Sequence, residues 1–303
     1  MQLGEGWCAA ECVRKLGYIA RTEGRYDEAR RASDKASHEF STLGDTISSA
    51  YCLTELGIIA FMEGRYSDSR YAHEEARVKF LSVGESTTFC LEGLGDVARV
   101  EGRYQDSRDL YKLSRAEAVK DVNQSQSAYS LLWLAATDAM DEQYESARRG
   151  LLKAQEEFVQ LRNPNGIAEC LKWLGNADRG EGRFDDARRN LEAAHQEFMR
   201  QGQSPDVAEC LQGLGYTEAV EGRYKEGRQH LEGAIGIFRQ LGIPKGVADC
   251  LTSLGELLMK EGRIAEAQSS LEEAQESYET MGVGDWWRSR CVALLADLPS
   301  PSE

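Results

Sequence analysis

Apolar and small residues follow one pattern that occurs seven times along the chain. In the second copy the apolar residues follow helical spacing and predict a first helix, called helix A here: Cys52, Leu53, Leu56, Ile59 and Ala60. A Glu-Gly-Arg-Tyr turn follows, whose glycine is expected to end the helix in a left-handed conformation. Ser69, Ala76 and Phe80 then predict a second helix, helix B, which ends at Gly84. Each repeat is therefore expected to be a pair of helices.

The turn recurs at a nearly constant interval. The turn begins at Glu23, Glu63, Glu101, Glu181, Glu221 and Glu261, and a divergent copy of it begins at Asp141. Successive copies lie 40 residues apart, except for one step of 38. An internal period of this length indicates a repeat array. We predict an all-α, right-handed α-solenoid of seven helix pairs, with a C-terminal capping helix at 285–298 and a disordered tail at 299–303. The expected repeats are about 5–44, 45–84, 85–122, 123–162, 163–202, 203–242 and 243–282.

Charge and cysteine content narrow the class of protein. The net charge of -15 and the pI near 4.9 disfavour a nucleic-acid surface and an anionic membrane. No signal peptide or membrane-spanning run is visible, so we expect a cytoplasmic protein. Six cysteines share one repeat position, four residues before the leucine of a Leu-Gly pair, and are expected to be small buried thiols: Cys12, Cys52, Cys90, Cys170, Cys210 and Cys250.

The repeat resembles the tetratricopeptide repeat in Leu174, Gly175, Gly182, Phe184, Ala187 and Ala194. It departs from that family where Leu171 replaces a tryptophan, where the terminal proline is missing, and in its 40-residue length. The longer repeat is similar to those of the Pins/LGN adaptors and of the sensor arrays at the C-termini of STAND-class NTPases, and more loosely to kinesin light chains. The resemblance implies that helix A lines a concave groove.

Residues that vary between repeats at the groove positions are the candidate binding residues. By analogy with the family these positions lie five, two and one residues before the conserved leucine and two, five and six after it. They predict a partly apolar groove for an extended or helical peptide, because tyrosine and tryptophan are frequent binding anchors. The candidates are Arg14, Tyr51, Phe61, Phe89, Arg99, Tyr129, Trp133, Lys172, Trp173, Arg179 and Tyr216. The alternative is that the aromatic side chains pack between neighbouring A helices.

The basic candidates suit an acidic-hydrophobic peptide: Arg14, Arg99, Lys172 and Arg179. The sequence lacks the Lys/Asn set of a chaperone-type carboxylate clamp, so capture of a C-terminal carboxylate is not predicted. The recurring Glu and Arg residues of the turns are interpreted as turn and inter-repeat ion pairs, because a feature present in every repeat serves the repeat.

We find no catalytic constellation, no metal site, no cofactor motif and no phosphate-binding loop in the sequence. The four histidines lie in separate B helices and are expected to face solvent: His38, His73, His195 and His230. An enzyme acting through Cys8 or Cys12 is the least favoured hypothesis.

The leading hypothesis is a non-catalytic protein- or peptide-binding scaffold. The alternative is the C-terminal ligand-sensing and oligomerising region of a STAND signalling NTPase. It is motivated by Leu3-Gly4, which would place the start of the chain in the last turn of a preceding helix B, as if more protein lay upstream. Self-association through open repeat ends is considered for the same reason.

Overall fold

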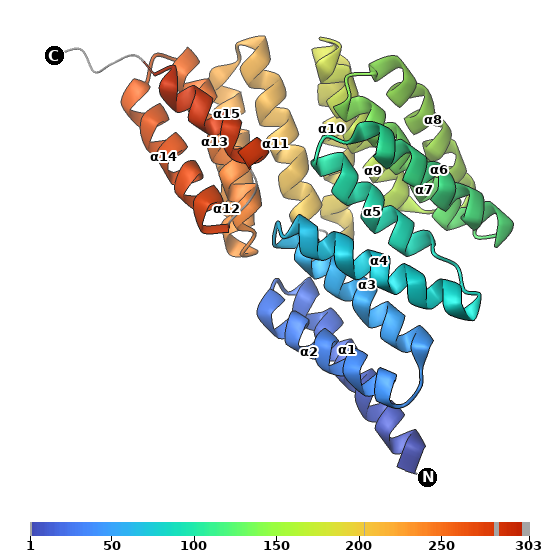
Figure 1. Ribbon diagram of the computed structural model, residues 1–303. Helices are drawn as coiled ribbons and strands as arrows, with labels where there is room; N and C mark the ends of the chain where they lie inside the picture. The colour runs from blue at the N-terminus through green and yellow to red at the C-terminus, as the bar shows by residue number, and fades with distance from the viewer. Residues whose placement is uncertain (1, 203, 282–284, 299–303) are drawn as a thin grey trace. The chain divides into compact units, whose positions relative to one another are not determined.

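The computed structural model describes residues 2–202, 204–281 and 285–298 and is all-helical within them (Figure 1). Helices with odd numbers are the A helices and those with even numbers are the B helices. In chain order the helices are α1 Gln2–Thr22, α2 Tyr26–Thr42, α3 Thr46–Met62, α4 Tyr66–Val83, α5 Thr88–Val100, α6 Tyr104–Lys120, α7 Gln124–Met140, α8 Tyr144–Gln160, α9 Pro164–Gly180, α10 Phe184–Gln201, α11 Ser204–Glu221, α12 Tyr224–Gln240, α13 Pro244–Lys260, α14 Ile264–Met281 and α15 Asp285–Ala296.

The chain divides into two compact units, Met1–Thr137 and Asp138–Glu303. The first contains α1–α6 and most of α7, and the second contains the end of α7 and α8–α15. In both units successive helices pack against each other in sequence order, for example α3 against α4 and α9 against α10. The predicted all-α array of helix pairs is thereby confirmed. The handedness of the superhelix and the repeat boundaries stay predictions.

The turn between helices A and B forms as the sequence predicts. Gly64 has a φ of 76°, and Gly182 has a φ of 77°. In this left-handed region a glycine has no Cβ to clash with the following carbonyl. The amide of Arg65 donates to the carbonyl of Ala60 over 2.8 Å, which closes the end of α3. The repeated glycine therefore sets the reversal of the chain.

Small side chains and thiols allow the helices to approach closely. In the first unit Ala50, Ala76, Phe80 and Cys90 form one buried cluster. In the second unit a cluster at the equivalent place contains Ala168, Ala194, Phe198, Val207 and Cys210. The prediction of buried thiols is confirmed for five of the six cysteines at the shared repeat position, whereas Cys12 is exposed on α1.

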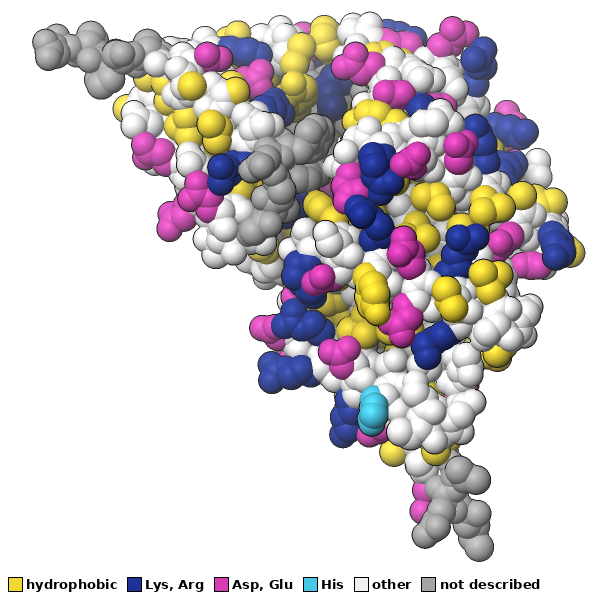
Figure 2. All heavy atoms as spheres, in the orientation of Figure 1, with side chains coloured by type: hydrophobic (Ala, Val, Ile, Leu, Met, Phe, Trp, Pro, Cys, Tyr) yellow, Lys and Arg dark blue, Asp and Glu magenta, His cyan; other side chains and the backbone are white. Residues whose placement is uncertain are grey.

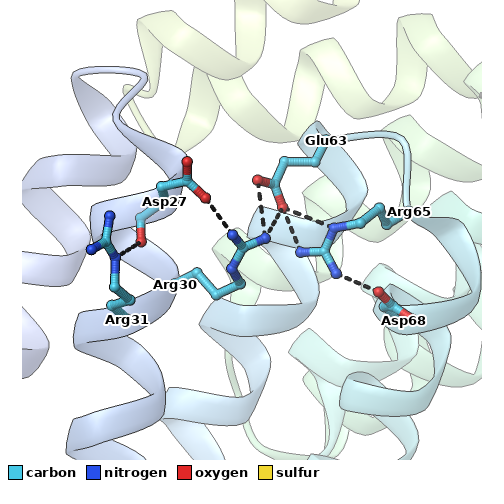
Figure 3. A network of polar contacts seen from close by, with 6 residues as sticks. All are labelled: Asp27, Arg30, Arg31, Glu63, Arg65 and Asp68. Carbon is cyan, nitrogen blue, oxygen red and sulfur yellow. Dashed lines mark hydrogen bonds and ion pairs between the residues drawn. The ribbon is translucent and has the colours of Figure 1, made fainter. Parts of the chain in front are cut away.

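Ion pairs link the turns of consecutive repeats, as interpreted from their recurrence. Arg30 of α2 lies 3.4 Å from Glu63, which also accepts a hydrogen bond from Nε of Arg65 over 3.0 Å (Figure 3). Asp27 and Asp68 complete the chain of charges at its two ends (Figure 3). Each exposed pair contributes at most about 1 kcal/mol, so the network fixes turn geometry more than it adds stability.

Three predictions differ from the structure. α1 runs without a break from Gln2, so Leu3-Gly4 is part of helix A rather than the end of a preceding helix B. His73 is only 1% exposed, and Nδ1 of His230 lies 2.6 Å from Glu218, so these two histidines do not simply face solvent. α15 ends at Ala296, two residues before the predicted end of the capping helix. The predicted tail at 299–303 lies outside the described residues.

Acidic and basic side chains are interspersed over the face of the molecule shown in Figure 2, with hydrophobic side chains between them. No helix in the described part of the chain has the length and hydropathy needed to cross a membrane.

Candidate binding surface

An aromatic column follows the A helices of the first unit. Tyr51 of α3 and Phe89 of α5 each lie five residues before the conserved leucine of their repeat, and they are 46% and 49% exposed. Tyr129 of α7 occupies the same repeat position and is half-buried. The ring of Tyr51 meets the buried Phe80 edge-on, with 5.0 Å between centroids. This contact orients the tyrosine while nearly half of it stays available to a ligand.

The other aromatic candidates of the first unit lie further inside. Phe61 packs beside Tyr66 with 5.5 Å between ring centroids. Trp133 is half-buried, and the guanidinium of Arg99 lies 5.7 Å from its ring centroid. For these residues the alternative of packing within the helix array describes the contacts better than an open groove does.

The basic candidates of the first unit already have carboxylate partners. Arg14 donates from Nη2 to Glu11 over 2.7 Å. Arg99 donates from Nη2 to Asp96 over 2.6 Å, and the hydroxyl of Tyr111 donates to the same carboxylate over 2.8 Å. Their positive charge is therefore largely compensated within the protein.

Lys172 in the second unit is 5% exposed and is surrounded by carboxylates. Its Nζ atom lies 3.1 Å from Glu169, 3.2 Å from Asp206 and 2.6 Å from Glu209. These charges raise the pKa of Lys172 although burial opposes the shift. Three carboxylates on one ammonium leave no positive charge for an acidic ligand, so Lys172 serves to join α9 to α11. Trp173, the next residue, is half-buried.

A different situation holds at Arg179, near the end of α9. Its guanidinium lies 4.8 Å from the ring centroid of Tyr216 on α11, and the guanidinium of Arg290 on α15 lies 5.2 Å from the same centroid. Nη1 of Arg179 donates to the amide oxygen of Asn176 over 2.9 Å. Burial, and then the neighbouring charge of Arg290, lower the pKa of Arg179, against the tyrosines beside it. Arg179 forms no ion pair with any described residue.

The structure thus brings together two pairs of the predicted residues, Arg99 with Trp133 and Arg179 with Tyr216. Arg290 is not among the residues predicted from the sequence, because α15 lies outside the seven regular repeats. Within the described ranges no three His, Cys, Asp or Glu side chains are arranged to hold a metal ion.

The fold and the repeated turn define a class of helical-repeat proteins, and the comparisons agree with that class. Residues 207–280 match a family model described as a tetratricopeptide repeat. A comparison with curated protein sequences found no match. Residues 207–280 are therefore similar to the tetratricopeptide-repeat family, and the other helix pairs have the same architecture. The narrower resemblances to Pins/LGN adaptors and STAND-class arrays stay predictions.

Solved structures with the same fold share little sequence with this chain. The Rap conjugation gene regulator of plasmid pLS20, in complex with the Phr* peptide, is 14% identical with a TM-score of 0.73, over 89% of this chain and 73% of that one. NprR with its cognate peptide NprX is 13% identical with a TM-score of 0.63, over 96% and 82%. A tetratricopeptide repeat protein from Parabacteroides merdae is 12% identical with a TM-score of 0.57, over 95% and 99%. At these identities the likeness concerns the fold alone.

Proposed function

We propose that the protein is a non-catalytic scaffold that binds a peptide along its A helices. The observation that carries this proposal is the column of half-exposed aromatic rings at one repeat position, Tyr51 and Phe89. Aromatic side chains supply large apolar contact areas at low entropic cost and are frequent anchors for bound peptides. Successive A helices present this position side by side, so the rings form a row along which an extended or helical peptide can lie.

The fold supports the same proposal. Two structurally similar proteins, the pLS20 Rap regulator and NprR, were solved with peptides bound. Within the proposal the peptide lies in the concave groove, in the cytoplasm, and neither nucleic acid nor membrane is a partner. An apolar peptide fits the aromatic row, whereas the positive charges of Arg14, Arg99 and Lys172 are compensated within the protein.

The test is a selection of phage-displayed random peptides on the purified protein, followed by calorimetry with the selected synthetic peptides. Tyr51→Ala and Phe89→Ala are expected to weaken binding by about tenfold or more each, the effect of removing a binding anchor. Tyr71→Ala is the matched control, because Tyr71 is a more exposed tyrosine, at 69%, on helix B α4. Equal affinities for all three variants would exclude the aromatic row as the binding site.

The alternative function, a sensing and oligomerising region of a STAND NTPase, stays a prediction, as does self-association through the repeat ends. A phosphate-binding loop encoded in the same reading frame would support the STAND hypothesis. Light scattering coupled to size exclusion tests self-association, and a monomer at all concentrations would contradict it.

A further inference from the structure

The arginine two residues before the Glu-Gly-Arg turn has a charged hydrogen-bond acceptor in the third repeat and a neutral one in the fifth. Arg99 and Arg179 both lie five residues after the conserved leucine, and both donate to the side chain three residues earlier. In the third repeat that acceptor is the carboxylate of Asp96, over 2.6 Å. In the fifth it is the neutral amide of Asn176, over 2.9 Å. The hydrogen bond is kept and the negative charge is lost.

The surroundings of Arg179 do not replace that charge. A second cation, Arg290, lies over the same tyrosine ring. Arg290 and Lys260 both pair with a single carboxylate, Glu256, Lys260 over 3.2 Å. Glu256 is therefore shared by two cations, and Arg179 has no ion pair with any described residue.

An uncompensated cation in a half-buried site is costly, because burial removes water that would otherwise solvate the charge. The face of Tyr216 offsets part of this cost, since a guanidinium is attracted to an aromatic ring. It does not supply an acceptor for the remaining N–H groups of Arg179. A planar guanidinium in this state is suited to a carboxylate, which accepts two parallel hydrogen bonds.

We propose that Arg179, Tyr216 and Arg290 form an anion subsite on the A helices of the second unit, and that it takes a carboxylate of a peptide ligand. That the carboxylate belongs to a peptide rests on the proposed function; the subsite itself does not. Asn176 is the residue that keeps the subsite open, because an aspartate there would occupy Arg179 as Asp96 occupies Arg99.

The test follows the side-chain Nε–H signals of Arg179 and Arg290 by NMR while small carboxylates are added to the whole protein at constant ionic strength. The probes are N-acetylaspartic acid α-amide, which presents a side-chain carboxylate, and N-acetylalanine, which presents a C-terminal one. N-acetylasparagine α-amide is the neutral control. A saturable shift of the Arg179 signal with either carboxylate, and none with the asparagine compound, is expected; which probe binds more tightly identifies the source of the carboxylate.

Two variants at one position separate charge from packing. Asn176→Asp is expected to weaken carboxylate binding at least about tenfold, because the new carboxylate competes for the guanidinium. Asn176→Ala removes the amide without adding charge, so its affinity is expected to stay within about twofold of wild type. No saturable shift with either carboxylate, or equal affinity in wild type and Asn176→Asp, would overturn the subsite. Selected peptides could still bind through the aromatic row in that case, so the two proposals fail independently.

Discussion

His73 packs between α3 and α5, where the absence of a side chain on Gly57 and on Gly93 leaves room for its ring. An ideal Cβ built on Gly93 of α5 would lie 2.3 Å from Nε2 of His73, and one built on Gly57 of α3 would lie 2.6 Å from the same atom. Ordinary van der Waals contacts of a Cβ atom are 3.4–4 Å. The ring is buried and has a helix backbone close on both sides, so it has little room to retreat. We predict that Gly93→Ala destabilises the protein.

The magnitude follows from two opposing effects. Adding a methyl group to a well-packed interior costs about 1–3 kcal/mol. Replacing glycine by alanine within a helix contributes about 1 kcal/mol in the other direction. The net loss expected for Gly93→Ala is therefore up to about 2 kcal/mol. Gly236→Ala is the matched control, because it adds the same methyl within α12 where no heavy atom lies within 4 Å. It is expected to stabilise by about 1 kcal/mol.

Urea unfolding followed by circular dichroism gives the stability of each variant, and native-state hydrogen exchange shows where protection is lost. In a repeat array the loss is expected first in α3, α4 and α5, because each repeat contacts mainly its neighbours. His73→Ala should relieve the overpacking, so the double variant should be more stable than the sum of the two single changes. The reasoning is refuted if Gly93→Ala stabilises like Gly236→Ala, or if its cost is unchanged when His73 is alanine.

Three further predictions concern buried ionisable groups and thiols. Burial raises the pKa of Glu92 to about 7 from 4.5, so between these pH values the folded state holds a proton that the unfolded state releases. The protonated Glu92 therefore stabilises the fold fully below pH 4.5, and this stability is lost as the pH rises through about 7. Glu92→Gln should remove roughly 3 kcal/mol of pH dependence from the free energy of urea unfolding, and an unchanged pH profile would contradict this. Asp178 is fully buried and contacts Arg148 at 2.6 Å, Arg183 and Asn190. Asp178→Ala should therefore lower the free energy of unfolding by about 3–5 kcal/mol, whereas Glu145→Ala, at an exposed ion pair, should lower it by at most about 0.5 kcal/mol. Similar decreases in the urea midpoints of the two variants would contradict the role of burial. Of the eight cysteines, Cys8 and Cys12 are exposed and the other six are buried. Two thiols should therefore react quickly with Ellman's reagent in the native protein, and all eight after unfolding. Rapid reaction of more than two would show that the helix packing around the buried thiols is open.

The regular part of the fold was predictable because the same residue pattern recurs in each repeat. A glycine that must adopt a positive φ, an alanine that permits close approach and an apolar residue at helical spacing act through local geometry, and Gly64, Ala76 and Phe80 behave as their positions predict. The turn charges were predictable for the same reason. The exception, Cys12, lies at the shared position on α1, which has neighbouring helices on only one side in this unit.

The candidate site was predictable only in part, because availability for a ligand depends on neighbours from other repeats. Lys172 and Arg179 looked alike in the sequence as basic residues at groove positions. The structure surrounds Lys172 with three carboxylates and places Arg179 beside a tyrosine and a second arginine. His73 was expected in solvent, yet it fills the space left by Gly57 and Gly93.

The sequence by itself therefore determined the helices, their turns and their order, since these depend on backbone conformation and on contacts that recur every repeat. The tertiary structure alone decided which rings remain exposed and which charges gain partners from other repeats, as Lys172 does from Asp206 and Glu209. The clearest case is Arg290, which lies beyond the regular repeats and meets Tyr216 only once α15 has packed in the fold.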